Sequence, residues 1–134
     1  MTVRLKYIVA LILFSLIVAC GEGLQQKADM YEASELSKMM RDMVTWSKQA
    51  KHKLQNGGTI QHVPKAFYDM KNQVATRGEH KEAAFLGMVP TYINALKGIE
   101  RKDSQQYYYD ASIRACKTCH SVYCDGPMQI INQL

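Results

Sequence analysis

Five residues near the C-terminal end of the chain, Cys116-Lys117-Thr118-Cys119-His120, constrain its fold more than any other feature. The spacing C-x-x-C-H is the attachment motif of a c-type haem. The two thiols add across the vinyl groups of the haem as thioethers, and the histidine coordinates the iron. In a helix the three side chains project from one face, because they are three and four residues apart. The motif therefore predicts one covalent haem, held by Cys116 and Cys119, with His120 as the proximal iron ligand.

Two other interpretations use the same cysteines. A zinc site could take Cys116, Cys119 and Cys124, but it would need a fourth ligand, and His120 would crowd Cys119 in a tetrahedron. A redox-active C-x-x-C pair is typical of chains with a βαβ pattern, and no segment here alternates as a strand does. We expect haem attachment rather than either alternative.

The first 19 residues have the pattern of an export signal. Arg4 and Lys6 precede an apolar run that is too short to span a bilayer as a helix of the mature protein. The run ends in Val18-Ala19-Cys20-Gly21, which resembles a bacterial lipoprotein box. We expect cleavage before Cys20 and lipidation of its thiol, and several acyl chains would anchor the protein firmly. An ordinary signal peptide with an incidental cysteine is the alternative.

The predicted export signal and the predicted haem agree, because haem c is attached outside the cytoplasm. We therefore expect a periplasm-facing lipoprotein of a bacterial envelope. The residue after Cys20 is Gly21 rather than the aspartate linked to inner-membrane retention, which favours the outer membrane.

The charge and the residue types restrict the function. Without residues 1–19 the chain has 15 basic and 12 acidic residues, a net charge of +3, with no basic run. Nucleic acid is therefore not an expected partner, whereas docking to an acidic redox partner is compatible with this charge. No Ser-His-Asp order, carboxylate pair or nucleotide-binding loop stands out, so we do not expect an enzyme.

The rest of the chain predicts helices. A polar tether over residues 20–28 leads to a domain over 29–134, in which apolar residues recur at steps of three and four. We expect helices over about 29–55, 64–77, 80–99 and 104–120. The expected inward-facing residues are Leu36, Met40, Met43, Ser47, Ala50 and Leu54, then Phe67, Met70 and Val74, then Phe85, Met88, Tyr92, Ala95 and Ile99, and finally Tyr109, Ile113, Cys116 and His120.

Local signals support these boundaries. Asp29 or Ser34 suits the cap of the first helix, and Asn56-Gly57-Gly58 suits its end. Pro90 lies inside the third helix and predicts a kink. A short apolar tail, with Ile130, Ile131 and Leu134, is expected to pack back on the bundle. Four amphipathic helices joined by short loops predict an all-α, antiparallel four-helix bundle with the haem motif on the last helix.

This arrangement resembles the cytochrome c prime family, the class II c-type cytochromes with a four-helix bundle. The resemblance covers about residues 30–124 and rests on the motif in the last helix and on Tyr123, an aromatic residue three positions beyond His120. It implies a haem in the core near one end of the bundle, with its distal side facing the first helix. The chain departs from the family at Cys124, where members usually have a basic residue.

The resemblance implies that the first helix decides the function. Some members coordinate a methionine there and carry electrons, whereas others leave the iron five-coordinate and bind gases such as NO or CO. The first helix offers Met39, Met40 and Met43. Met40 is the expected distal ligand because it lies on the inward face, with Met43 as the fallback, and Met39 is offset. An open site and a purely structural role for the methionines stay open.

The other histidines and the fourth cysteine have no role in this scheme. We expect His52, His62 and His80 to be surface imidazoles, because none lies mid-helix on an apolar face. Cys124 is left without a partner. A buried structural thiol, an intermolecular disulfide and a further role at the site all stay open.

The expected function is that of a monohaem cytochrome that carries single electrons between envelope redox proteins. A five-coordinate haem protein that binds or scavenges NO or CO is the alternative. A zinc-stabilised envelope lipoprotein is a third, non-haem alternative. Whether the protein forms a homodimer stays open.

Overall fold

A computed structural model of the protein describes residues 32–134. The described part consists of helices joined by short connections, and it contains no strand, which confirms the predicted all-α class. Its elements are α2 (Glu35–Gln55), the 3-10 helices η1 (Lys65–Asn72) and η2 (Gly78–Lys81), α3 (Ala83–Glu100), α4 (Gln105–Tyr123) and α5 (Met128–Ile131). The predicted signal segment 1–19, the tether 20–28 and Cys20 lie outside the described residues.

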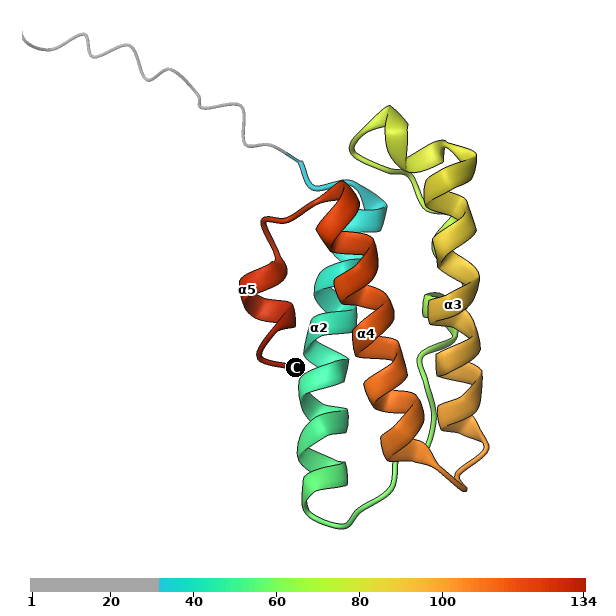
Figure 1. The fold of residues 1–134 in the computed structure, drawn as a ribbon, viewed down its shortest axis with the longest axis vertical. Coiled ribbons are helices and arrows are strands. Elements are labelled where there is room, and N and C mark those ends of the chain that lie inside the picture. Colours follow the sequence, from blue (N-terminus) through green and yellow to red (C-terminus); the bar gives the residue numbers. More distant parts are fainter. Residues whose placement is uncertain (1–31) are drawn as a thin grey trace, which may run out of the picture. The chain divides into compact units, whose positions relative to one another are not determined.

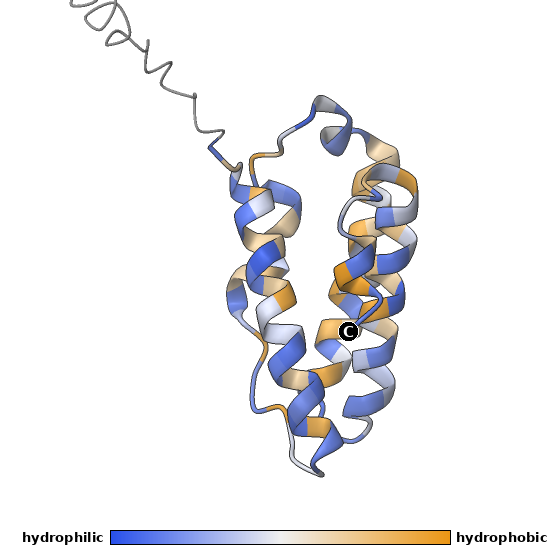
Figure 2. Cartoon of the chain, turned by 90° about the vertical axis from the view of Figure 1, so that its left-hand side faces the viewer, coloured by the Kyte–Doolittle hydropathy of each residue, from blue (hydrophilic) through white to orange (hydrophobic). Residues whose placement is uncertain are grey.

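Helix α4 lies beside α3, with which it makes the most extensive contact, and it also contacts α2 (Figure 1). Figure 2 shows hydrophobic and hydrophilic residues alternating along each of them, as expected of helices that bury one face. This arrangement is compatible with a helical bundle. None of the helices within residues 32–134 combines the length and apolarity required to cross a membrane.

Helix α2 begins after Ser34, one of the two predicted caps, and it ends where the sequence predicts. The Ser34 hydroxyl accepts a hydrogen bond from the backbone N–H of Ser37 at 3.2 Å, which satisfies one of the free donors of the first turn. The helix ends at Gln55, and Gly57 then adopts a φ of 71°, a left-handed conformation that glycine enters without steric cost. Asp29, the other predicted cap, lies outside the described residues.

The inward face of α2 differs from the prediction at Met39, Met40 and Leu54. Its buried residues are Leu36, Met39, Met43, Ser47 and Ala50. Met40 and Leu54, which we expected on this face, are half-buried and pack against the core from its edge. A helix has 3.6 residues per turn, so either the third or the fourth residue after Leu36 satisfies the periodicity. The packing against the neighbouring helices selects Met39.

The second predicted helix is wrong in type and in length. Instead of an α-helix over 64–77, the chain forms the 3-10 helix η1. Phe67 and Met70 are buried as predicted, although the backbone leaves the helical conformation at Asp69, between them. The predicted stripe stops there, since the chain becomes extended after η1 and Val74 is 53% exposed.

The extended segment that replaces the end of this helix covers the beginning of α2. The backbone N–H of Leu36 donates to the Val74 carbonyl at 3.0 Å, and the Val74 N–H donates to the Glu35 carboxylate at 3.3 Å. The hydroxyls of Ser34 and Thr76 are 2.8 Å apart and hydrogen-bonded. The first of these bonds satisfies the Leu36 N–H, a helix-end donor that has no partner within α2.

The third predicted helix begins later than expected. The segment around His80 forms the separate 3-10 helix η2, and α3 starts at Ala83 and continues as a helix through Pro90. The kink at Pro90 stays a prediction. Buried on α3 are Phe85, Val89, Tyr92, Ala95, Leu96, Gly98 and Ile99, whereas Met88, predicted to face inward, is half-buried.

Helix α4 and the C-terminal tail pack together as predicted. Tyr109 and Ile113 of α4 are buried, and so is Ile131 of α5. The Tyr109 hydroxyl lies 3.2 Å from the Ser47 carbonyl and 3.3 Å from the Leu134 carbonyl, so it ties α2, α4 and the chain end to one point. Ile130, which we expected to pack with the tail, is 45% exposed.

Candidate haem site

The C-x-x-C-H residues lie in the last two turns of α4. The segment is helical, as the argument from spacing requires, and Cys116, Cys119 and His120 are all half-buried. Cys116 and Cys119 pack against the hydrophobic core. Their thiol groups therefore face apolar surroundings, where a porphyrin edge would find hydrophobic contacts.

The imidazole of His120 has the hydrogen bond that a metal-binding histidine needs. Its Nδ1 lies 3.0 Å from the backbone carbonyl oxygen of Cys124. A carbonyl oxygen only accepts hydrogen bonds, so Nδ1 carries the proton and donates it. The neutral imidazole then keeps its lone pair on Nε2, which is the tautomer of a histidine that binds metal through Nε2.

The turn after α4 holds this carbonyl in place. The Cys124 N–H donates to the His120 carbonyl at 3.1 Å, so His120 and Cys124 are joined by two hydrogen bonds. The Cys124 thiol is half-buried and not in a disulfide. The contact that links Cys124 to the motif is made by its backbone carbonyl, a role that sequence reasoning did not foresee.

The two motif thiols have raised pKa values. Burial raises the pKa of Cys116 to about 12, and the neighbouring Cys119 adds to the rise. Burial also raises the pKa of Cys119, with a further contribution from Cys124. Both groups are uncharged at neutral pH. A thioether is uncharged as well, so these surroundings suit the thioether product of haem attachment.

The described residues contain no group of three or more side chains placed to bind a metal ion. Within residues 32–134, no three side chains of His, Cys, Asp and Glu come together in a way that could hold a metal ion. The cysteines at 116, 119 and 124 are all free thiols. The geometry therefore gives no support to the zinc interpretation.

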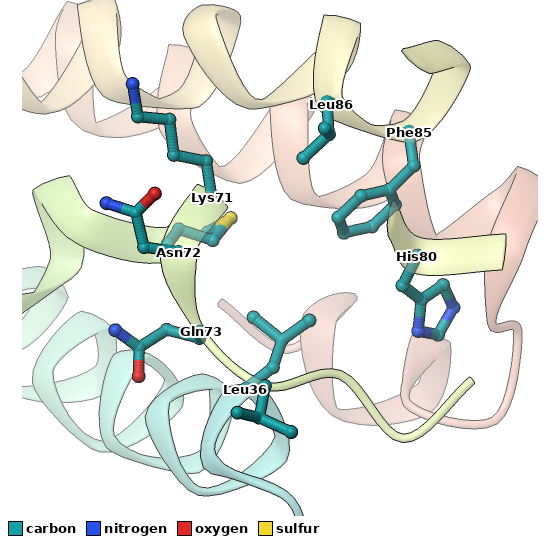
Figure 3. A pocket seen from close by; sticks show the side chains of 9 residues that line it. Leu36, Lys71, Asn72, Gln73, His80, Phe85 and Leu86 are labelled. Carbon is teal, nitrogen blue, oxygen red and sulfur yellow. The ribbon is translucent and has the colours of Figure 1, made fainter. Parts of the chain in front are cut away.

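A cavity of about 290 Å³ lies between the beginning of α2, the end of η1 and the beginning of α3 (Figure 3). Its size is at the lower end of the range for small-molecule pockets. It is lined by Leu36, Met70, Lys71, Asn72, Gln73, Val74, His80, Phe85 and Leu86. The lining thus combines apolar groups with one imidazole, one thioether and one amine.

Three aromatic rings connect this cavity to the haem motif. The Phe85 ring, which lines the cavity, is 5.4 Å from the Tyr123 ring in an edge-to-face contact. The His80 ring lies 5.1 Å from Phe85 and 6.3 Å from Tyr123, measured between ring centroids. Tyr123 follows His120 by three residues in α4, so both side chains lie on the same side of the helix.

His80 corrects one of the sequence expectations. We expected three surface imidazoles, and His52 and His62 are indeed exposed. The His80 side chain is half-buried, and its Nε2 atom is buried without a hydrogen-bond partner. The reason is that η2 folds the ring against Phe85 instead of leaving it at the open start of a longer helix.

The methionines of α2 lie in the core rather than around the cavity. Met39 and Met43 are 8% and 6% exposed, and Met40 is half-buried. None of the three lines the cavity. Met70 does line it, and sequence reasoning missed this thioether as a candidate because it assigned Met70 only to the apolar stripe of the second helix.

Comparisons with protein-family models, with curated proteins and with solved structures found no match. The function must therefore be argued from the residues themselves. The donor set fits haem c: two thiols in apolar surroundings, and an imidazole with its Nε2 lone pair free.

Proposed function

We propose that the protein is a monohaem c-type cytochrome of the cytochrome c prime type that carries single electrons between redox proteins of the bacterial envelope. The observation that carries this proposal is the hydrogen bond from His120 Nδ1 to the Cys124 carbonyl. It occurs at the one histidine that completes a C-x-x-C-H motif, and it sets the tautomer that iron ligation requires. No other histidine of the described residues follows such a motif.

In this proposal each group has a defined task. Cys116 and Cys119 hold the haem as thioethers, and His120 is the proximal ligand. Bound haem supplies one-electron redox chemistry, while the protein sets its potential through ligand identity, burial and hydrogen bonding. The apolar core against which Cys116 and Cys119 pack would lower the local dielectric constant and limit the access of water.

The same function implies a fold for the helices and a place for the protein in the cell envelope. We infer that α2, η1, α3 and α4 form the antiparallel four-helix bundle, with η1 in the place of the second helix. The predicted export signal and lipidated Cys20 would put the protein at the periplasmic face of the envelope, with the outer membrane favoured. Its electron donors and acceptors would be other envelope proteins, and self-association into a dimer is a separate question.

A gas-binding haem protein is the second candidate. The observation that favours it is that Met39, Met40 and Met43 do not line the cavity. If no side chain coordinates the distal face, the iron is five-coordinate and open to NO or CO. Rapid CO binding by the ferrous protein, together with a high-spin ferric spectrum, would identify this function.

The test of the proposed function is covalent haem in the exported protein. Produced in a bacterial host that matures c-type cytochromes, the full chain should keep its haem through acid–acetone extraction. The Cys116→Ser/Cys119→Ser double variant should lose the covalent haem, whereas the matched control Cys124→Ser should keep it. If the wild-type protein purified from the same host contains no haem, or contains zinc instead, the proposal is refuted.

A further inference from the structure

The Nε2 atom of His80 is a buried polar atom that has no hydrogen-bond partner among the described residues. An unsatisfied buried group of this kind destabilises the folded state, because it loses its hydrogen bonds to water and gains none in the protein. Native structures rarely retain such a group without a function, so it is a candidate for binding something that the polypeptide alone does not supply.

The surroundings of His80 indicate what that partner is. The ring lines the cavity and contacts Phe85 and Tyr123. Tyr123 lies one helical turn beyond His120, so His80 is close to the end of α4 that carries the haem motif. Among the cavity-lining groups, an imidazole nitrogen is a common ligand for iron.

We propose that His80 would bind the iron of the haem through Nε2, as a second protein ligand in addition to His120. This inference rests on the proposed function, because it concerns the same cofactor. It replaces the expectation that Met40 coordinates the iron. It also favours electron transfer over gas binding, since a six-coordinate iron has no open position.

The competing donors are less well placed. Met40 and Met43 belong to α2 and do not line the cavity. Lys71 lines it, but its side chain is exposed to solvent. Met70 is the remaining competitor, with a buried thioether at the cavity wall, and it has no unsatisfied polar atom that requires a partner.

The inference predicts the electronic character of the iron. Ligation by methionine and histidine raises the reduction potential. Ligation by two imidazoles lacks the thioether and should give a lower potential. The ferric protein should therefore be low-spin and should lack the weak far-red absorption band of a methionine–iron bond.

The experiment uses the haem-loaded protein and its optical and electron paramagnetic resonance spectra. Wild type should be low-spin without the far-red band. His80→Ala should become high-spin in the ferric state, and added imidazole should restore the low-spin spectrum. CO should bind the ferrous His80→Ala protein at least about tenfold faster than wild type. The controls His62→Ala, at an exposed imidazole, and Met40→Ala should both match wild type.

The outcomes separate this inference from the proposed function. A far-red band in wild type that disappears in Met40→Ala or Met70→Ala would overturn the assignment of His80, and so would a high-spin wild type. If His80→Ala does not accumulate, His80→Met keeps a side chain that can bind iron. It should acquire the far-red band, and a spectrum identical to that of wild type would refute the inference. A protein that carries no covalent haem at all would refute the proposed function itself.

Discussion

His120 keeps its Nε2 nitrogen free because of the path that the chain takes after α4. The helix ends at Tyr123, and the next residue turns its carbonyl back toward the imidazole. The side chain of Cys124 is not needed for this hydrogen bond. A single residue thus acts on the candidate iron ligand through its backbone, which is why its thiol gave no clue from the sequence.

Gln105 is the residue with the clearest structural role outside the site. Its side chain is buried, accepts from the Ile60 N–H at 2.8 Å, and donates to the carbonyls of Ile60 and Ile99 at 2.7 and 2.8 Å. It therefore joins the loop after α2 to the connection between α3 and α4. Each of the three backbone groups would lose its partner if this side chain became apolar.

We expect Gln105→Leu to lower the free energy of unfolding by about 2–4 kcal/mol, because it leaves several buried backbone groups unsatisfied. Urea unfolding followed by circular dichroism would measure the change. The matched control is Gln106→Leu, whose exposed side chain bonds only to Asp110, and it should change stability by less than about 0.5 kcal/mol. Equal losses in the two variants would contradict the role of Gln105.

At the scale of elements, α5 and residues 132–134 form a C-terminal clamp that packs against the core and bonds to neighbouring helices. Ile131 inserts into the core, and the chain end accepts hydrogen bonds from Tyr109 at Leu134 and from Lys51 at Gln133. Lys51 belongs to α2 and Tyr109 to α4, so the residues that follow α5 link both helices. The turn that presents the Cys124 carbonyl lies between α4 and this clamp.

Ile131 and Ile130 provide a matched pair for testing the clamp. Ile131 is 3% exposed and Ile130 is 45% exposed. Ile131→Ala should destabilise the protein by about 2–5 kcal/mol, because it leaves a cavity in the core. Ile130→Ala should have an effect within about 0.5 kcal/mol. Thermal unfolding of both variants would show the difference, and a similar midpoint for the two would mean that α5 does not hold the end of the bundle.

The elements also show what the sequence could predict. The periodic stripes located α2, α3 and α4 because each buries one face over several turns. The second helix failed because Phe67 and Met70, three residues apart, fit a 3-10 helix as well as an α-helix. His80 was misjudged because its burial depends on Phe85 and Tyr123, and Tyr123 is distant in the sequence. The motif residues Cys116, Cys119 and His120 were assigned from spacing alone, and their chemistry still awaits the haem test.

At the scale of the whole molecule, buried tyrosines connect stability to pH. Burial raises the pKa of Tyr109 to about 12, with Asp110 and then Cys116 contributing. Burial likewise raises the pKa values of Tyr92 and Tyr68 above the usual value for tyrosine. A raised pKa means that the folded state binds the phenolic proton more tightly than the unfolded state does. This stabilisation is complete below about pH 10, the pKa of tyrosine in an unfolded chain.

We therefore expect stability to fall as the pH rises from about 10 toward 12, because the unfolded chain releases its phenolic protons first. Phenolate absorbance and circular dichroism, recorded together against pH, would follow the change. Tyr109 should lose its phenolic proton only as the protein unfolds. Tyr107→Phe is the control and should leave the unfolding pH unchanged. Full titration of all tyrosines near pH 10 in a folded protein would contradict the prediction.

The packing of Cys116 against the core has a consequence for how the protein is made. A half-buried thiol that packs against the core of the closed bundle is less accessible to a vinyl group than the same thiol in an open chain. If the protein carries haem, we therefore expect the thioether to form more readily before the helices pack. Attachment of the cofactor would then follow translocation and precede closure of the helices. A chain that folds before the cofactor is attached would remain as a stable apoprotein without haem.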